Sequence, residues 1–259
     1  MRRNLFILVA SAALFIQCKS DTGQAANGRL PSASAESSVA GALQTGKVVT
    51  ITTADNVVIV GSLYVSAAKA PAVLCLHQWR SDRSHFQALA ASLMKQGYTV
   101  LAIDMRGHGE SVKKKDGSAV APDRNAIQDV RAAIAFLKGQ ESVDASRIAI
   151  VGASYGSSNA IMYAAGDPAV KAVALLSPGL NFFNVLPIEP AVSQYARGAM
   201  LAVASAEDLR SVEAIDKIKG IAKSDLTTKI YDNAGHGTDI LEANVGLQDI
   251  IAQFLKKNL

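Results

Sequence analysis

The sequence predicts an α/β domain in which a doubly wound, mostly parallel β-sheet carries helices on both faces. Short runs that are almost uniformly apolar recur along the chain, segments of helical periodicity separate them, and no internal repeat is present. Strands buried on both faces and separated by amphipathic helices are typical of a parallel sheet that helices cover on both sides. The 259 residues, 49% of them hydrophobic, suffice for one domain of this kind.

The first two expected strands differ from the others in pattern. Lys47–Thr53 and Val57–Val65 alternate apolar and polar residues around the turn formers Ala54–Asn56, which predicts an antiparallel hairpin at the edge of the sheet. Six apolar runs predict the remaining strands, at Ala72–His77, Tyr98–Asp104, Arg147–Gly152, Val170–Leu176, Ala199–Ala204 and Leu226–Tyr231. Helical periodicity predicts five helices, at Asp82–Gln96, Asp123–Lys138, Tyr155–Ala165, Ser211–Ile218 and Thr238–Leu255.

Residues 1–18 have the composition of a targeting segment. A basic tetrapeptide precedes about a dozen apolar residues, Leu5–Ile16, as in a secretory signal peptide, and this run is short for a membrane span. Cys18 resembles the acylated cysteine of a bacterial lipobox, although Gln17 departs from the small residue usual before it. We expect a protein lipid-anchored through Cys18 in the bacterial cell envelope, outside the cytoplasm; a secreted or periplasmic protein is the alternative.

Residues 19–46 join this segment to the expected domain at 47–259. Serine, alanine, glycine and glutamine dominate there, and such a composition buries too little apolar surface to offset the entropy of ordering. We therefore expect a flexible tether. The second cysteine of the chain, Cys75, lies inside an apolar run and is expected to be a buried free thiol.

The charge of the chain is mild. The formal net charge is +4, and no basic stripe with interleaved aromatic residues occurs, so a nucleic-acid partner is not expected. The charged run Lys113–Asp116 is interpreted as a solvated loop.

The pentapeptide Gly152-Ala153-Ser154-Tyr155-Gly156 follows an apolar, β-branched strand pattern and is followed at once by a helical one. This is the strand, turn and helix context in which G-x-S-x-G holds a nucleophilic serine on a sharp turn. Both glycines are needed, because such a turn leaves no room for side chains two positions before and after the serine. Ser154 is therefore the candidate nucleophile, and a serine hydroxyl needs a base to activate it.

Together with this serine turn, which we call the serine elbow (Gly152–Gly156), three further stretches resemble the α/β-hydrolase superfamily. They are Leu76–Trp79, the D-x-R-G-H-G-x-S pattern within Ala102–Ser111, and Gly235–Gly237. The overall pattern is most similar to the dienelactone-hydrolase-like and prolyl-oligopeptidase-like esterase branch, over about Lys47–Leu259. The resemblance implies an eight-stranded sheet with an active site at its carboxyl edge, and neither a cofactor nor a metal is expected.

The resemblance also implies the order nucleophile, acid, histidine along the chain. Of the four histidines, His236 alone follows Ser154, in a glycine-rich loop after the last expected strand, and it is the expected base. The acid is expected two strands after the nucleophile, where the family spacing G-x-x-D places Asp208 although Ser205 replaces the glycine. Glu207 remains the alternative acid.

The resemblance implies two backbone N–H groups that bind the oxyanion. One belongs to Tyr155, after the nucleophile, and the other to Trp79 in the loop after Ala72–His77; because Gln78 replaces the usual glycine, Gln78 is the alternative donor. The other three histidines are expected in loop hydrogen bonds or facing solvent, outside the triad: His77, His108 and His85.

These residues predict a serine hydrolase that cleaves carboxylic esters of small or medium acyl groups through an acyl-enzyme on Ser154. The segment Ser177–Gln194 is too short for a large cap domain, which favours an open site. The expected partners are a small-molecule ester and, through the anchor, a membrane. Three alternatives remain: a peptidase or a thioesterase with the same triad, and a non-catalytic surface-binding lipoprotein on a hydrolase fold.

Overall fold

The computed structural model describes residues 46–66, 69–124, 126–243 and 245–259. The predictions for the signal peptide, for Cys18 and for nearly all of the tether lie outside the described residues.

All eight expected strands are present in one sheet, in the order β1-β2-β4-β3-β6-β7-β10-β11. The antiparallel pair β1 and β2 forms the predicted edge hairpin, β2 is antiparallel to β4, and every pairing from β4 to β11 is parallel. The strands have the bounds β1 Lys47–Thr52, β2 Val57–Tyr64, β3 Ala70–Leu76, β4 Thr99–Ile103, β6 Val143–Ala153, β7 Val170–Leu176, β10 Ala199–Ser205 and β11 Asp225–Tyr231.

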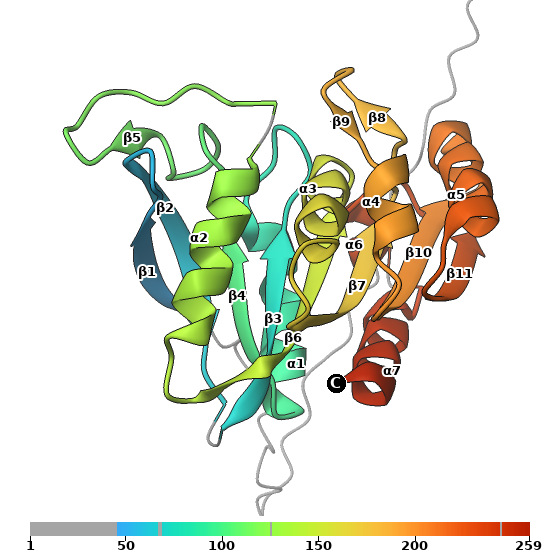
Figure 1. Cartoon of the computed structure of the whole chain (residues 1–259), viewed down its shortest axis with the longest axis horizontal. Coiled ribbons are helices and arrows are strands. Elements are labelled where there is room, and N and C mark those ends of the chain that lie inside the picture. Colours follow the sequence, from blue (N-terminus) through green and yellow to red (C-terminus); the bar gives the residue numbers. More distant parts are fainter. Residues whose placement is uncertain (1–45, 67–68, 125, 244) are drawn as a thin grey trace, which may run out of the picture. The chain divides into compact units, whose positions relative to one another are not determined.

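Helices pack on both faces of this sheet, as the uniformly apolar strands predict. Along β3, Ala72, Leu74 and Leu76 face a core that includes residues of α2, α3 and α4, whereas Val73 and Cys75 face a second core with α1 and α7. In Figure 1, α2, α3 and α4 lie in front of the sheet. The helices are α1 Gln87–Lys95, α2 Ile127–Lys138, α3 Tyr155–Ala164, α4 Glu189–Gln194, α5 Leu209–Ile221, α6 Asp239–Glu242 and α7 Leu247–Asn258.

Two predicted helices differ from the observed ones. The first begins as a short 3₁₀ helix, η1 (Arg83–Phe86), which Asp82 caps by accepting a hydrogen bond from the Ser84 N–H, before α1 follows. The helix predicted over Thr238–Leu255 is divided into α6 and α7, and Gly246 precedes α7 with a φ of 77°. Such a left-handed residue ends helical geometry, so one continuous helix was wrong.

Two segments outside the expected strands and helices contain short strands. Lys113–Lys114 forms strand β5, which pairs antiparallel with Val57–Val58 of β2; the expected solvent exposure is confirmed, and the expected loop was wrong. Between β7 and β10 the chain forms a small hairpin, β8 (Asn181–Phe182) with β9 (Leu186–Pro187), and then α4. In Figure 1 this hairpin stands at the end of the sheet where α3 begins.

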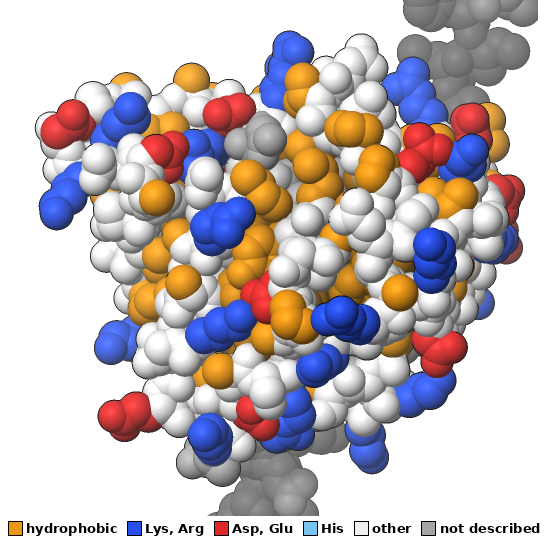
Figure 2. Space-filling model, viewed as in Figure 1, with side chains coloured by type: hydrophobic (Ala, Val, Ile, Leu, Met, Phe, Trp, Pro, Cys, Tyr) orange, Lys and Arg blue, Asp and Glu red, His pale blue; other side chains and the backbone are white. Residues whose placement is uncertain are grey.

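No helix within the described residues is long and apolar enough to cross a bilayer. Figure 2 shows that acidic and basic side chains are interspersed over the face that carries α2, α3 and α4. The buried free thiol expected at Cys75 is confirmed.

Candidate active site

The predicted site residues lie at one edge of the sheet. Ser154 follows β6, Asp208 follows β10, His236 follows β11, and Gln78 with Trp79 follows β3. Because these strands are parallel, their carboxyl ends meet at the same edge, which is where open α/β sheets place their sites.

Ser154 occupies a strained turn between β6 and α3. Its φ of 51° and ψ of −111° are unusual for a residue with a side chain, and its N–H donates to the Leu176 carbonyl of β7 at 2.7 Å. A Cβ at Gly156 would lie 2.3 Å from the Leu76 carbonyl oxygen, and one at Gly152 would lie 2.4 Å from the Gly156 oxygen. Both glycines are therefore required for close backbone packing, as the motif predicts.

Ser154, His236 and Asp208 form a hydrogen-bonded chain. The Ser154 Oγ lies 2.7 Å from His236 Nε2, and His236 Nδ1 lies 2.6 Å from Asp208 Oδ2. Since a carboxylate can only accept, Nδ1–H donates to Asp208 and leaves Nε2 to accept the serine proton. Burial disfavours the charged carboxylate of Asp208, but hydrogen bonds from Ser211 and His236 outweigh it and lower the pKa of Asp208. The carboxylate is ionised at neutral pH.

Glu207, the alternative acid, points to backbone instead of to the histidine. Its carboxylate accepts the N–H groups of Asn233 at 3.0 Å and Gly235 at 2.9 Å. Hydrogen bonds from the Ser205 hydroxyl and from Gly235 lower the pKa of Glu207 to about 2. The geometry brings Asp208 to His236, whereas Glu207 holds the loop that carries this histidine.

Three further side chains hold the same loop, which we call the histidine loop (residues 233–238). Ser205 Oγ accepts the Ala234 N–H at 2.8 Å, and Ser177 Oγ accepts the Gly237 N–H at 2.8 Å. Gln78 Oε1 accepts both the N–H of Thr238 at 2.7 Å and its hydroxyl at 3.0 Å. Sequence reasoning noted Ser205 and Gln78 only as replacements of family glycines and did not find these contacts.

The loop after β3 carries both candidates for the second oxyanion donor, the N–H groups of Gln78 and Trp79. The Gln78 carbonyl accepts hydrogen bonds from His77 Nδ1 at 2.7 Å and from the Ser81 N–H at 3.2 Å. In a trans peptide the N–H of the next residue points the opposite way, so the Trp79 N–H is directed away from His77. Among the described residues, none accepts a hydrogen bond from the N–H of Gln78, Trp79 or Tyr155.

The other histidines lie outside this chain of hydrogen bonds, as expected. His77 accepts the Met105 N–H on Nε2 at 2.9 Å, and burial lowers the pKa of His77 to about 4, so the ring is neutral. His108 Nδ1 donates to the Arg106 carbonyl at 3.0 Å. His85, on η1, is half-exposed and lies 2.6 Å from Glu242 of α6.

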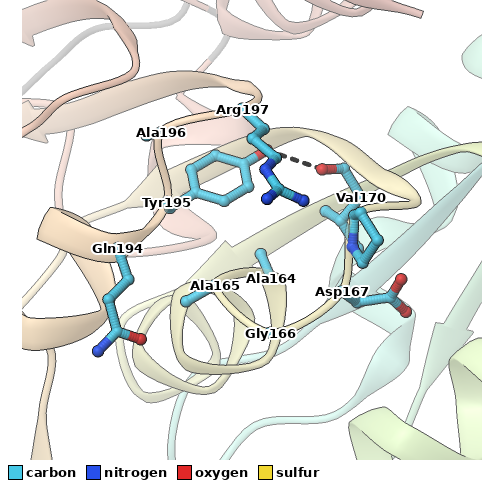
Figure 3. Close-up of a pocket in the computed structure, with 10 residues that line it drawn as sticks. Ala164, Ala165, Gly166, Asp167, Val170, Gln194, Tyr195, Ala196 and Arg197 are labelled. Carbon is cyan, nitrogen blue, oxygen red and sulfur yellow. Dashed lines mark hydrogen bonds between the residues drawn. The ribbon is translucent and has the colours of Figure 1, made fainter.

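A cavity of about 530 Å³ lies at His236 and Asp208, and we call it the catalytic cavity. Trp79 and Phe183 form part of its wall, with ring centroids 4.8 Å apart. A smaller cavity of about 190 Å³ lies between the end of α3 and the connection from α4 to β10 (Figure 3), where the Tyr195 hydroxyl donates to the Val170 carbonyl. It adjoins the amino end of β7, away from the triad. In the described part of the chain, no group of three or more His, Cys, Asp or Glu side chains could hold a metal ion.

Comparisons with curated proteins identify relatives over part of the chain. An uncharacterised protein of Mycobacterium tuberculosis (strain ATCC 25618 / H37Rv) is 32% identical over 157 residues, which cover 60% of this chain and 53% of that protein. A thiohydrolase of Arthrinium phaeospermum is 34% identical over 136 residues, or 51% of this chain and 43% of that protein. The chain spans about half the length of these relatives.

Solved structures share the fold. An esterase of Pyrococcus furiosus superposes with a TM-score of 0.65 at 20% identity, over 83% of this chain and 91% of that one. A dienelactone hydrolase from Anabaena variabilis gives 0.67 at 16% identity, over 83% and 98%. The family model of the alpha/beta hydrolase fold matches residues 71–215, from β3 to α5. This match includes the serine elbow and the Asp208 position, and the chain therefore belongs to the alpha/beta hydrolase fold family.

Proposed function

We propose that this protein is a serine hydrolase that cleaves carboxylic esters of small or medium acyl groups through an acyl-enzyme on Ser154. The observation that carries the proposal is the pair of short contacts on His236, 2.7 Å to Ser154 Oγ and 2.6 Å to Asp208 Oδ2. A serine hydroxyl, an imidazole and an ionised carboxylate at these distances are the groups that nucleophilic acyl transfer requires.

In acylation, Ser154 Oγ attacks the ester carbonyl carbon while its proton passes to His236 Nε2. The Asp208 carboxylate stabilises the imidazolium that forms. Charge develops on the former carbonyl oxygen, where the N–H groups of Tyr155 and Trp79 are available as donors, and Tyr155 begins α3, whose dipole favours a negative charge. The tetrahedral intermediate then expels the alcohol, which takes the proton from His236.

In deacylation the same groups act on water. His236 Nε2 removes a proton from a water molecule as that water attacks the acyl carbon, and the same oxyanion donors stabilise the second intermediate. Breakdown of this intermediate releases the acid and returns the proton to Ser154. The side chain of His236 is 43% exposed, so solvent water can reach it.

The catalytic cavity supports this substrate class. Its volume of about 530 Å³ and its aromatic wall of Trp79 and Phe183 suit a small or medium apolar acyl group. Thioesters are a second candidate class, because a relative 34% identical over half of this chain is a thiohydrolase and the same three residues would cleave a thioester.

A fluorophosphonate probe tests the nucleophile directly. We expect the wild-type protein to be labelled and Ser154→Ala to remain unlabelled. Ser158→Ala is the matched control, because Ser158 is also a buried serine and lies in α3, the helix that follows Ser154. This variant should be labelled like the wild type. Failure of the folded wild type to label, or equal labelling of Ser154→Ala, would exclude the proposal. A panel of 4-nitrophenyl esters from acetate upward, with matched thioesters, then measures the acyl range and the ester preference.

We further propose that Cys18 anchors the chain outside the cytoplasm, on the evidence of its position directly after an apolar run of signal-peptide length. In bacterial cells, metabolic labelling with a palmitate analogue should mark the full chain, and Cys18→Ala should abolish both the label and membrane sedimentation. An unlabelled wild-type chain in the soluble periplasmic fraction would contradict the anchor.

A further inference from the structure

A third cavity, of about 620 Å³, adjoins the catalytic cavity and shares Trp79 with it. We call it the arginine cavity, since Arg80 and Arg124 line it together with Trp79, Ser81, His108 and Pro122. Its volume is in the range of small-molecule sites. None of the catalytic steps described above uses it.

The two arginines of this cavity have no carboxylate partner among the described residues. The neighbouring arginines differ: Arg83 pairs with Asp104 and Glu110, and Arg106 pairs with Asp55 and Asp129. The Arg124 guanidinium lies over the Phe183 ring, 5.4 Å from its centroid. One carboxylate, Asp82, also lines the cavity, and it accepts the Ser84 N–H as the cap of η1. Two positive charges against one negative charge favour an anionic ligand.

The cavity wall also contains two buried polar atoms without a hydrogen-bond partner in the described part of the chain, Ser81 Oγ and His108 Nε2. The His108 side chain belongs to a residue that is 5% exposed, and its Nδ1 is engaged by the Arg106 carbonyl. Buried polar atoms left unpaired are costly, and these two make the wall of the arginine cavity polar.

Trp79 connects this cavity with the reacting centre. Its ring lies 4.8 Å from the His108 ring on the arginine side, and 5.3 Å from the ring of Tyr155, the residue after the nucleophile. Its backbone N–H is the second oxyanion donor of the proposed mechanism. Trp79 thus lies between the arginine cavity and the turn that carries Ser154.

We propose that the arginine cavity is a substrate subsite for an anionic oxygen group, a carboxylate or a phosphate, at the far end of the ester from the scissile bond. This inference rests on the proposed ester hydrolysis and adds the substrate class. Guanidinium groups bind both anions through paired, charge-assisted hydrogen bonds.

Matched ester pairs test this subsite. The glutaric acid monoester of 4-nitrophenol is compared with the neutral 4-nitrophenyl valerate, which places the anion on the acyl side. Acetates of 4-hydroxybenzoic acid and of 4-hydroxyphenyl phosphate are compared with 4-methylphenyl acetate, which places a carboxylate or a phosphate on the alcohol side. In wild type at low ionic strength we expect at least one anionic ester to exceed its neutral partner about tenfold in kcat/KM, and the ratio to fall as salt is added.

The arginine variants assign the effect. Arg80→Gln and Arg124→Gln should each lower the anionic-to-neutral ratio about fivefold to tenfold, whereas Arg80→Lys, which keeps the charge, should lower it less. Arg197→Gln removes the same charge at the remote cavity of Figure 3 and should leave the ratio unchanged. All are checked for an unaltered melting temperature.

The outcomes separate this inference from the proposed function. Neutral esters cleaved in a Ser154-dependent manner, with no preference for any anionic ester, would overturn the subsite and keep the hydrolase. A preference that Arg197→Gln lowers as much as the two cavity variants would also overturn it, because the net charge alone would then be responsible. Absence of Ser154-dependent cleavage of every ester would instead refute the proposed function.

Discussion

Gln78→Met will disconnect the loop after β3 from the histidine loop without shortening the side chain. In the wild type, Gln78 Oε1 accepts the Thr238 N–H at 2.7 Å and the Thr238 hydroxyl at 3.0 Å, and Thr238 is fully buried. Methionine offers no comparable acceptor, so the Thr238 N–H is left unpaired. One such group costs about 1–3 kcal/mol, which is the loss expected in the free energy of unfolding.

The expected effect on activity follows from the position of Thr238, two residues after His236. A misplacement of about 1 Å in a catalytic group lowers the rate about a hundredfold, and with the other loop contacts intact we expect kcat to fall about tenfold to a hundredfold. Because the Gln78 side chain does not line the catalytic cavity, KM should change much less than kcat.

Urea unfolding followed by circular dichroism measures the stability, and 4-nitrophenyl acetate gives kcat and KM. Thr238→Val removes the hydroxyl donor at nearly constant shape, and the double variant should show a coupling of about 0.5 kcal/mol or more with Gln78→Met. Gln96→Met, at the exposed end of α1, is the control and should stay within about 0.5 kcal/mol of wild type. A Gln78→Met protein with wild-type stability and wild-type kcat would refute the connecting role of this side chain.

Four further outcomes are expected. Asp208→Asn should lower kcat about 10⁴-fold, because the amide favours the wrong imidazole tautomer of His236. Glu207→Gln keeps an acceptor for the histidine loop and should lower kcat less than tenfold. Equal losses of kcat would contradict the assignment of Asp208 as the acid. Burial lowers the pKa of His77 to about 4 in the folded protein, from 6.5 in the unfolded chain, so between these pH values only the unfolded chain binds the proton. The free energy of unfolding should therefore fall by about 3 kcal/mol from pH 6.5 to pH 4 and level off below. His77→Gln should flatten this pH dependence in urea titrations. Gly156→Ala should destabilise by about 2 kcal/mol or more in thermal melts, because its Cβ would lie 2.3 Å from a carbonyl oxygen. Gly220→Ala, in α5 with open space around it, should instead stabilise by up to about 1 kcal/mol, and a loss there would show that the melts report something other than packing.

The central strands were predictable because burial on both faces of the sheet imposes a recognisable sequence pattern. A strand buried on both faces must be apolar at every position, and Ala72–Leu76 and Ala199–Ala204 are. β5 was not predicted, because its side chains are not buried. Lys113 and Lys114 are exposed, and their strand geometry comes from pairing with the backbone of β2, which no side-chain pattern records.

The triad was predictable to different degrees. Ser154 and His236 lie in glycine-flanked motifs whose glycines are needed by the backbone, so their positions carry a local signal. Asp208 and Glu207 follow the same strand and are adjacent, and composition cannot separate them. What separates them is direction: Glu207 turns to the amides of the histidine loop and Asp208 turns to the imidazole.

The histidine loop shows how an exposed side chain can be held for catalysis. The His236 side chain is 43% exposed, and Gly235 and Gly237 on either side have positive φ, so burial and local propensity do little to fix it. Instead, every backbone N–H from residue 233 to 238 donates to a side-chain oxygen, supplied in chain order by Glu207, Ser205, Glu207, Asp239, Ser177 and Gln78. Most of these acceptors follow β3, β7 and β10, so the sheet edge fixes the loop backbone directly. For the proposed deacylation this arrangement meets two demands at once, since the imidazole stays oriented toward Ser154 while solvent water can still reach it.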